Sequence, residues 1–278
     1  FFLRLDPLGA DHLSVYGYKR EPPPVLDSSP AENRKLAHAI PAAPWTPASV
    51  ATMFTGLYPT SHGMMPPNDR EITKSAAIKL SHQHRTIAEV LKEHGYFTAG
   101  VSPNPWITEE FGFTQGFDEF YFINRKIAEK ITESGEEILS KWISDKQKEP
   151  FFLYLHYLDP HDPYTPPAPF NQKFKGPLTK SPFSYDQATQ EMINQYDGEI
   201  SYLDTQIGKL FSFLKEKNLY EDLFIIVVSD HGEQFYEHGD LRHGYKLFNE
   251  EVHVPLIIKT GKNSDPHKTI SETVSTVD

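Results

Sequence analysis

The chain has 278 residues, carries a formal net charge of -11 and contains no cysteine. This length suffices for one large α/β domain, whereas the acidic balance argues against nucleic acid as a partner, because binding a polyanion requires a surplus of Lys and Arg. Without cysteine there are no disulfides, no thiolate metal ligands and no cysteine nucleophile.

Short apolar runs rich in β-forming residues alternate with longer helical patterns along the chain. In chain order, strands are predicted at residues 1–6, 96–102, 151–156, 223–229 and 254–259. Several of them contain consecutive apolar residues, most clearly at 224–228, which is typical of strands buried on both faces. The alternation predicts a three-layer α/β/α sandwich around a mostly parallel central sheet.

Three helices are predicted between these strands. The first covers residues 86–93 and stops at Gly95, and the second covers residues 127–146. The third, of about 25 residues, precedes the fourth strand and has apolar residues at spacings of three and four. These are Ile193, Tyr196, Ile200, Leu203, Ile207, Leu210 and Leu214. Residues 21–30 and 159–182 are predicted to be loops.

Carboxylates and imidazoles follow three of the predicted strands. Because ligands of parallel α/β sheets bind beyond the carboxyl ends of the strands, these side chains are candidates for one site. Any single aspartate after a strand can instead be a turn or cap residue, and that alternative stays open for each alone. The candidates are Asp6 after the first strand, Asp159 and His161 beyond the third, and Asp230 and His231 after the fourth.

The pair Asp230-His231 is the sharpest of these elements. Both side chains can point at one ion when the backbone turns, and Gly232 permits that turn. A carboxylate and an imidazole suit zinc or manganese better than calcium, which prefers oxygen ligands throughout. We therefore expect a divalent metal ion as cofactor, with zinc or manganese favoured, calcium as the alternative and Asp6 as the second carboxylate.

The segment Ala43-Pro44-Trp45-Thr46-Pro47-Ala48-Ser49 has two interpretations. It can be a plain helix start, with Thr46 as N-cap and Pro47 at the first helical position, which needs no catalysis. Alternatively, the helix N-terminus binds a phosphate or sulfate ester. In that case the Thr46 hydroxyl attacks the ester, provided that a metal lowers its pKa.

Four segments resemble the sulfatase family of the alkaline-phosphatase superfamily. They are residues 5–13 with Tyr16-Gly17-Tyr18, residues 43–63, residues 151–167, and residues 228–243 followed by Val254-Pro255-Leu256-Ile257. These matches span almost the whole chain in the family's order. The resemblance implies Asp6, Thr46, Asp230 and His231 as metal ligands, Thr46 also as the nucleophile, and His161 and His243 as catalytic residues that bind the substrate.

Departures from the family pattern bear on the substrate. Sulfatases that use formylglycine have Cys or Ser at the nucleophile, Pro two residues later and Arg four residues later, where this chain has Thr46, Ala48 and Val50. Threonine cannot become formylglycine. The resemblance then implies the members with an unmodified hydroxyl, and our leading expectation is hydrolysis of a phosphodiester or phosphonate. The substrate would be a small-molecule, glycan or lipid ester, and hydrolysis of a sulfuric ester is the alternative.

Two further alternatives remain open. Asp159, His161 and His243 could form a second metal site, although their spacing favours a single ion. The other is a binding protein that keeps the fold but has lost its chemistry, an alternative motivated by the departures from the family pattern at Gly9, Ala48 and Val50. The intact candidate ligands argue against that loss.

The hydropathy of the chain and the sequence at its two ends bear on its solubility and on the extent of the domain. No window approaches the ~20 consecutive apolar residues of a membrane span, and no signal peptide begins the sequence. The chain is therefore expected to be soluble, and neither its compartment nor its oligomeric state can be predicted. An apolar run covers residues 1–5 and residues 273–278 stop without a terminating pattern. We therefore expect one catalytic domain, residues 1–278, that lacks its C-terminal portion.

Overall fold

The computed structural model describes residues 1–20, 24–27, 34–65, 79–124, 127–145, 149–178, 181–261 and 269–278. Its centre is an eight-stranded sheet in the order β10-β2-β9-β6-β1-β5-β3-β4. The strands are β1 (Phe2–Leu5), β2 (Arg34–Ile40), β3 (Phe97–Ser102), β4 (Glu119–Phe122), β5 (Phe151–Tyr157), β6 (Ile225–Ser229), β9 (Val254–Lys259) and β10 (Thr269–Ser275).

Strand β1 lies in the middle of the sheet and is parallel to both of its neighbours, β5 and β6. The pairs β3–β5, β3–β4 and β10–β2 are parallel as well, whereas β9 runs antiparallel to β6 and to β2. The sheet is thus mostly parallel, as predicted. The carboxyl ends of β1, β5 and β6 consequently meet at one edge, where ligands of such sheets bind.

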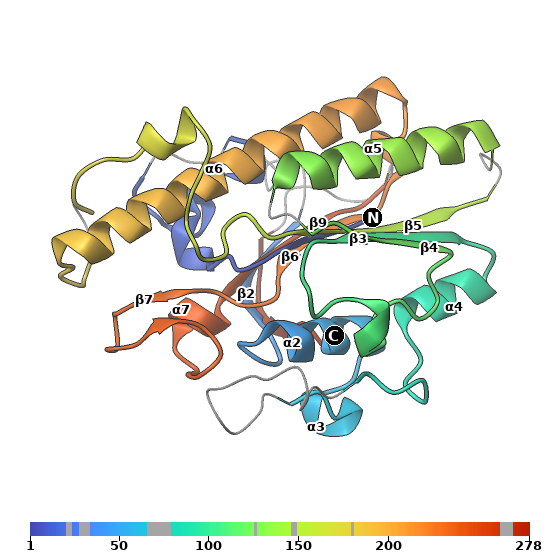
Figure 1. Cartoon of the computed structure of the whole chain (residues 1–278), viewed down its shortest axis with the longest axis horizontal. Helices are drawn as coiled ribbons and strands as arrows, with labels where there is room; N and C mark the ends of the chain where they lie inside the picture. Colours follow the sequence, from blue (N-terminus) through green and yellow to red (C-terminus); the bar gives the residue numbers. More distant parts are fainter. Residues whose placement is uncertain are drawn as a thin grey trace.

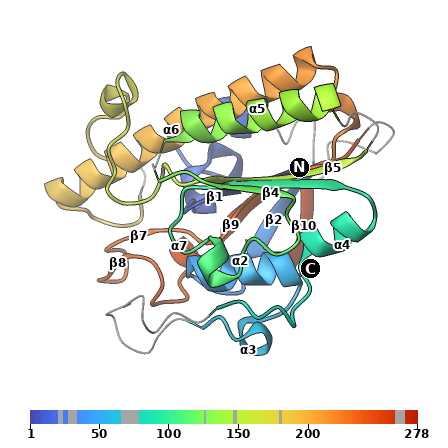
Figure 2. The same cartoon turned by 45° about the vertical axis from the view of Figure 1, so that its right-hand side comes forward.

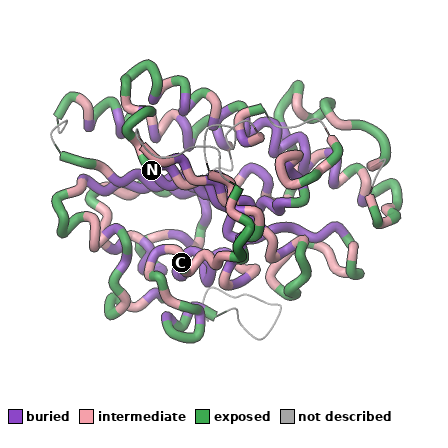
Figure 3. The backbone as a smooth tube through the Cα atoms, turned by 180° about the vertical axis from the view of Figure 1, so that it is seen from behind, coloured by how far each residue is buried: buried purple, intermediate pink, exposed green. Residues whose placement is uncertain are grey.

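Helices cover both faces of the sheet. Figures 1 and 2 show α5 and α6 on one face, and α2 and α4 on the other. The helices are α2 (Thr46–Thr55), α3 (Pro59–His62), α4 (Ile87–Glu93), α5 (Ala128–Asp145), α6 (Gln187–Glu216) and α7 (Asn249–Val252). The predicted three-layer sandwich is confirmed, and Figure 3 shows its buried strands between more exposed outer layers.

The predicted helices are present with small changes of their ends. Helix α6 is a 30-residue helix, longer than expected, and every residue of its predicted apolar stripe is buried. Helix α4 has Thr86 as its N-cap, whose side chain forms a reciprocal capping box with Glu89. Helix α5 corresponds to the second predicted helix as far as Asp145, and residue 146 lies outside the described residues.

The strand predictions were incomplete. The prediction that residues 224–228 are buried on both faces was wrong at Phe224, which is 51% exposed and precedes β6. Phe224 and Ile226 instead line an open hollow on the side of α2. The strands β2, β4 and β10 were not predicted, and neither was the small hairpin of β7 (Gln234–Phe235) and β8 (Leu241–Arg242).

The remaining segments are loops and short 3-10 turns. Residues 21–23 and 28–33, most of the first predicted loop, lie outside the described residues, as do residues 179–180 of the second. Elsewhere the second loop contains only the short turn η5. The 3-10 turns are η1 (Ala10–His12), η2 (Ser14–Tyr16), η4 (Glu109–Phe111), η5 (Phe170–Gln172) and η6 (Tyr220–Asp222). Among the described residues, no helix has the length and apolarity to cross a membrane.

Candidate active site

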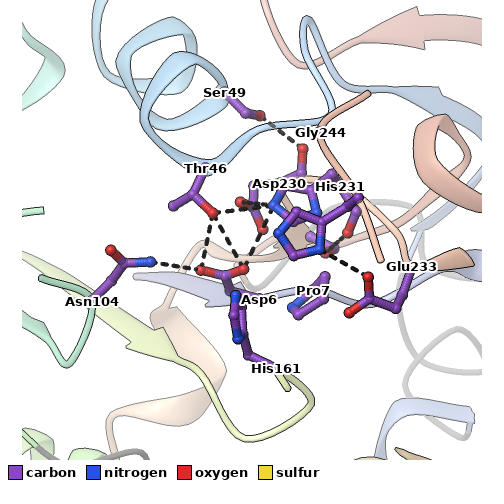
Figure 4. Close-up of polar contacts among 12 residues, drawn as sticks. Asp6, Pro7, Thr46, Ser49, Asn104, His161, Asp230, His231, Glu233 and Gly244 are labelled. Atoms are coloured by element: carbon purple, nitrogen blue, oxygen red, sulfur yellow. Dashed lines mark hydrogen bonds and ion pairs between the residues drawn. The ribbon is translucent and has the colours of Figure 1, made fainter. Parts of the chain in front are cut away.

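Three candidate ligands meet where β1 and β6 end. Asp6 directly follows β1, and Asp230 and His231 directly follow β6. One ligand atom from each of the three lies within 4.8 Å of the others, and all three side chains are completely buried. The parallel pairing of β1 with β6 explains this arrangement, because it brings both strand ends to the same edge. Figure 4 shows the three side chains directed toward one another.

Thr46 is the first residue of α2 and faces this cluster. Its Oγ1 lies 3.4 Å from each carboxylate oxygen of Asp6 and 3.1 Å from Nε2 of His231. The prediction that Thr46 is the N-cap was wrong, because Trp45 holds that position in an extended conformation. A capping hydroxyl would bond to the main chain of its own helix, whereas the Thr46 hydroxyl bonds to the candidate ligands.

The electrostatics of the cluster depend on a buried arginine. Burial alone would raise the pKa of Asp6, but the guanidinium of Arg4 and a hydrogen bond from His156 outweigh it and hold the pKa well below its usual value. Asp230 is buried as well, and Arg4 again outweighs burial and lowers its pKa. Both carboxylates are therefore ionised and can act as ligands.

The donor set fits a divalent transition ion. Two carboxylates, one imidazole and a hydroxyl are the oxygen and nitrogen donors that zinc and manganese accept. Oδ1 of Asp230 is buried and makes no hydrogen bond within the described part of the chain. Because a buried acceptor without a partner is costly, an ion bound to it would satisfy an atom that the protein leaves unsatisfied.

His161 and His243 flank the cluster. The ring centroids of His161 and His243 are 5.3 Å apart, and those of His231 and His243 are 4.1 Å apart. His161 lies on the loop after β5, and His243 follows β8. An ion pair between Arg242 and Asp162 (2.9 Å) connects the two loops. Two imidazoles thus stand beside the candidate ligands.

The possible second metal site of Asp159, His161 and His243 does not form a group close enough to hold an ion among the described residues. Oδ1 of Asp159 accepts a hydrogen bond of 2.9 Å from the main-chain N–H of Ala128, at the start of α5. This hydrogen bond holds one carboxylate oxygen of Asp159 at the start of the helix. Within the described ranges, the three-residue set of Asp6, Asp230 and His231 is the one close enough to hold an ion.

Four residues around the site were not predicted. Arg4 and His156 both contact Oδ2 of Asp6, and Asn104 donates to the same oxygen at 3.1 Å. Glu233 accepts from Nδ1 of His243 at 2.9 Å, and its other oxygen accepts from the hydroxyl of Tyr164. The sequence offered a signal for Arg4, which stands two residues before Asp6, because residues two apart in a strand project from the same face of the sheet.

Glu233 fixes the orientation of His243. The carboxylate is 1% exposed, and each of its oxygens accepts one hydrogen bond. Since Nδ1 of His243 bonds to Glu233, Nε2 is the nitrogen left to act on another group. Figure 4 shows Glu233 at the edge of the cluster.

Comparison with known proteins identifies the family. The model of the sulfatase family matches residues 1–278. The multifunctional alkaline phosphatase superfamily protein PehA of Trinickia caryophylli is 29% identical over 161 residues, which cover 44% of this chain and 31% of PehA. The chain thus spans less than a third of that relative's length.

Solved structures share the fold. The phosphonate monoester hydrolase of Agrobacterium radiobacter superposes with a TM-score of 0.79 at 18% identity, over 100% of this chain and 71% of that one. The C-terminal periplasmic domain of EcEptC from Escherichia coli, solved in complex with zinc, has a TM-score of 0.77 at 18% identity, over 99% and 78%. The family match over the chain and this shared architecture agree, and the chain belongs to the sulfatase family.

Proposed function

We propose that this chain is a metal-dependent hydrolase of phosphodiesters or phosphonate esters, with Thr46 as its nucleophile. The observation that carries the proposal is the position of the Thr46 hydroxyl, 3.1 Å from His231 and 3.4 Å from the oxygens of Asp6. The next hydroxyl along α2, that of Ser49, donates to the main-chain oxygen of Asp230 and supports the strand end. Thr46 is thus the hydroxyl presented to the cluster.

Each residue of the site has a role in this proposal. Asp6, Asp230 and His231 would hold the ion, with Thr46 as a further ligand. A zinc or manganese ion bound there would supply Lewis-acid chemistry, which lowers the pKa of a hydroxyl beside it. Thr46 then loses its proton to water, and its Oγ1 bonds to phosphorus while the bond to the leaving oxygen breaks.

The two outer histidines complete the reaction. His161 and His243 stand beside the cluster, where either can donate a proton to the leaving alkoxide or hydrogen-bond the transferring group. Water next attacks phospho-Thr46, releases the acid and restores the hydroxyl. Sulfate chemistry of the family relies on a formylglycine, whose second hydroxyl expels sulfate, and a threonine ester has no such route. Phosphorus accepts direct attack by water, which favours phosphoric over sulfuric esters.

A panel of matched substrates tests the proposal. Purified protein loaded with zinc or manganese is assayed with aryl esters of a phosphodiester, a phosphonate, a phosphate monoester and a sulfate. The phosphodiester or the phosphonate should be cleaved fastest. Faster release of sulfate would refute the assignment in favour of a sulfuric ester hydrolase, and metal binding without turnover of any ester would favour the binding-protein alternative.

Substitution of the nucleophile sharpens this test. Thr46→Ala should lower kcat by about 10³-fold or more, because covalent catalysis has no substitute hydroxyl, while zinc binding survives through the other three ligands. Thr55→Ala is the matched control, since Thr55 ends the same helix and, among the described residues, its hydroxyl bonds to the main chain of Ala51 and Leu57. Equal activity of both variants would exclude Thr46 as the nucleophile.

A further inference from the structure

Arg4 is a completely buried cation in contact with two of the candidate metal ligands. It lies on β1 two residues before Asp6, so both side chains project from the same face of the sheet. Nη2 of Arg4 lies 2.9 Å from Oδ2 of Asp6 and also contacts Oδ2 of Asp230. One guanidinium nitrogen thus bridges the two carboxylates of the cluster.

The other neighbours of Arg4 are neutral. Its Nη1 lies 3.4 Å from the hydroxyl oxygen of Tyr154 and 3.0 Å from Nε2 of His156. Burial raises the pKa of Tyr154 to about 12, and burial next to Arg4 lowers the pKa of His156 to about 4. At neutral pH, Asp6 and Asp230 are therefore the groups that balance the charge of Arg4.

Arg4 itself stays charged. Burial disfavours its charge, but the carboxylates of Asp230 and Asp6 outweigh burial and raise its pKa. Two carboxylates and one guanidinium leave the cluster with a net charge of minus one, because a ligating His231 is neutral. A divalent ion converts this to plus one. A loaded site of positive charge suits an anionic ester, in a chain whose overall charge is -11.

We propose that Arg4 is a built-in counter-charge that shares Asp6 and Asp230 with the metal ion. It holds the two carboxylates together without metal, weakens the binding of the ion through the repulsion of two nearby cations, and keeps the loaded site positive. The inference rests on the proposed function for the metal site. Outer residues of metal sites usually strengthen binding, and Arg4 should act in the opposite direction because it carries a positive charge.

Zinc affinity of the purified chain tests this inference without any assay of turnover. Arg4→Gln keeps hydrogen-bond donors but removes the charge, and should bind zinc about 10- to 100-fold more tightly than the wild type in competition with a chelator, the size of effect seen for outer-shell changes. Without metal, the same variant should melt about 5 °C or more below the wild type. Zinc should remove most of that difference.

Two controls separate charge from packing. Arg4→Lys keeps the charge and should bind zinc with near wild-type affinity, and Tyr154→Phe removes only the hydroxyl that contacts Nη1 and should do the same. Unchanged or weaker zinc binding by Arg4→Gln would overturn the inference. A wild-type chain that binds no divalent ion would instead count against the proposed function.

A measurement on the wild type covers the case in which Arg4→Gln does not fold. The buried guanidinium should give slowly exchanging ¹⁵N signals in NMR spectra, and titration with zinc should shift them because the ion takes hold of the same carboxylates. Shifted signals would support the shared carboxylates. Signals that do not move while zinc binds would show that Arg4 and the ion are independent, and would overturn the inference.

Discussion

The two faces of the sheet differ in what their side chains do. On the face toward α5 and α6, the central strands present mainly apolar residues, which pack against apolar residues of the two helices in the same core cluster. On the face toward α2, each central strand changes from apolar to ionisable toward its carboxyl end. The series are Phe2, Arg4 and Asp6 along β1, Phe152, Tyr154 and His156 along β5, and Ile226, Val228 and Asp230 along β6.

The difference between the faces shows that apolar packing and the charged site occupy different parts of this fold. Burying apolar area stabilises the fold wherever it occurs, whereas burying charge is costly unless partners compensate it. The charged end of the α2 face supplies those partners itself, since Arg4 pairs with both carboxylates and Glu233 pairs with His243. Substitutions at this charged end should therefore alter activity or metal binding, with or without an effect on stability, whereas substitutions on the α5/α6 face should alter stability alone.

After Thr46→Ala, the largest effect is expected from Glu233 at the charged end of the α2 face. Glu233→Gln should lower kcat/KM for an alkyl phosphodiester by about 10²-fold, the lower end of acid–base effects, because the partner of His243 loses the negative charge that favours the protonated imidazole. A p-nitrophenyl ester has a better leaving group and depends less on proton donation, so its kcat/KM should fall much less. Steady-state kinetics with both esters gives the comparison.

Tyr164→Phe is the control for Glu233. It removes the second partner of the carboxylate but leaves the contact between Glu233 and His243, and it should affect both esters only slightly. An equal loss for the alkyl and the aryl ester in Glu233→Gln would show that Glu233 merely supports the local structure.

A substitution on the opposite face should give the converse result. Leu203 on α6 is completely buried in the apolar core, and Leu203→Ala should lower the free energy of unfolding by about 2–5 kcal/mol. Activity per folded molecule should survive. Urea denaturation measures the first quantity, and Ser212→Ala on the exposed side of α6 provides the control. Lost turnover in a variant of unchanged stability would contradict the division between the faces.

The sequence predicted the central elements of the fold because their patterns are strong. Buried parallel strands consist of consecutive apolar residues, and α6 repeats its apolar residues over many turns. The strands β2 and β10 have mixed polar residues, and the exposed end of β4 lies at the edge of the sheet. Without a regular alternation they resemble loops, so periodicity could not find them.

The candidate site was predictable only in part. Asp6, Asp230 and His231 follow strands of one parallel sheet, and that topology dictates that they meet. The partners of these residues were not predictable in the same way. Arg4 stands inside an apolar run, where its contact with Asp230 depends on the neighbouring strand, and Glu233 reaches Tyr164 across 69 positions in the chain.

The smallest effect is expected from a buried histidine away from the charged edge. His62 on α3 is 2% exposed, its Nδ1 accepts a hydrogen bond from the main-chain N–H of Met64, and its Nε2 bonds to the hydroxyl of Thr52. Burial lowers its pKa to about 4, below the value of about 6.5 in an unfolded chain. Protonation would also break the hydrogen bond from Met64. Between these two pKa values the unfolded chain binds the proton and the folded protein does not, so stability must fall as the pH falls.

From pH 7 to pH 5 this single group should lower the free energy of unfolding by about 2 kcal/mol. Urea denaturation of the metal-free protein at both pH values measures the change. Other groups titrate over the same interval, so the informative quantity is the difference between variants. The loss of unfolding free energy between pH 7 and pH 5 should be about 2 kcal/mol smaller in His62→Gln than in the wild type. It should be unchanged in His82→Gln, which replaces an exposed histidine. His62 lies on the side of α2 but away from the metal ligands, and its substitution should affect stability alone. That result would show that an effect on activity depends on proximity to the ligands and not on the face of the sheet. An equal pH dependence in both variants would show that His62 is protonated in the folded protein as readily as in the unfolded chain.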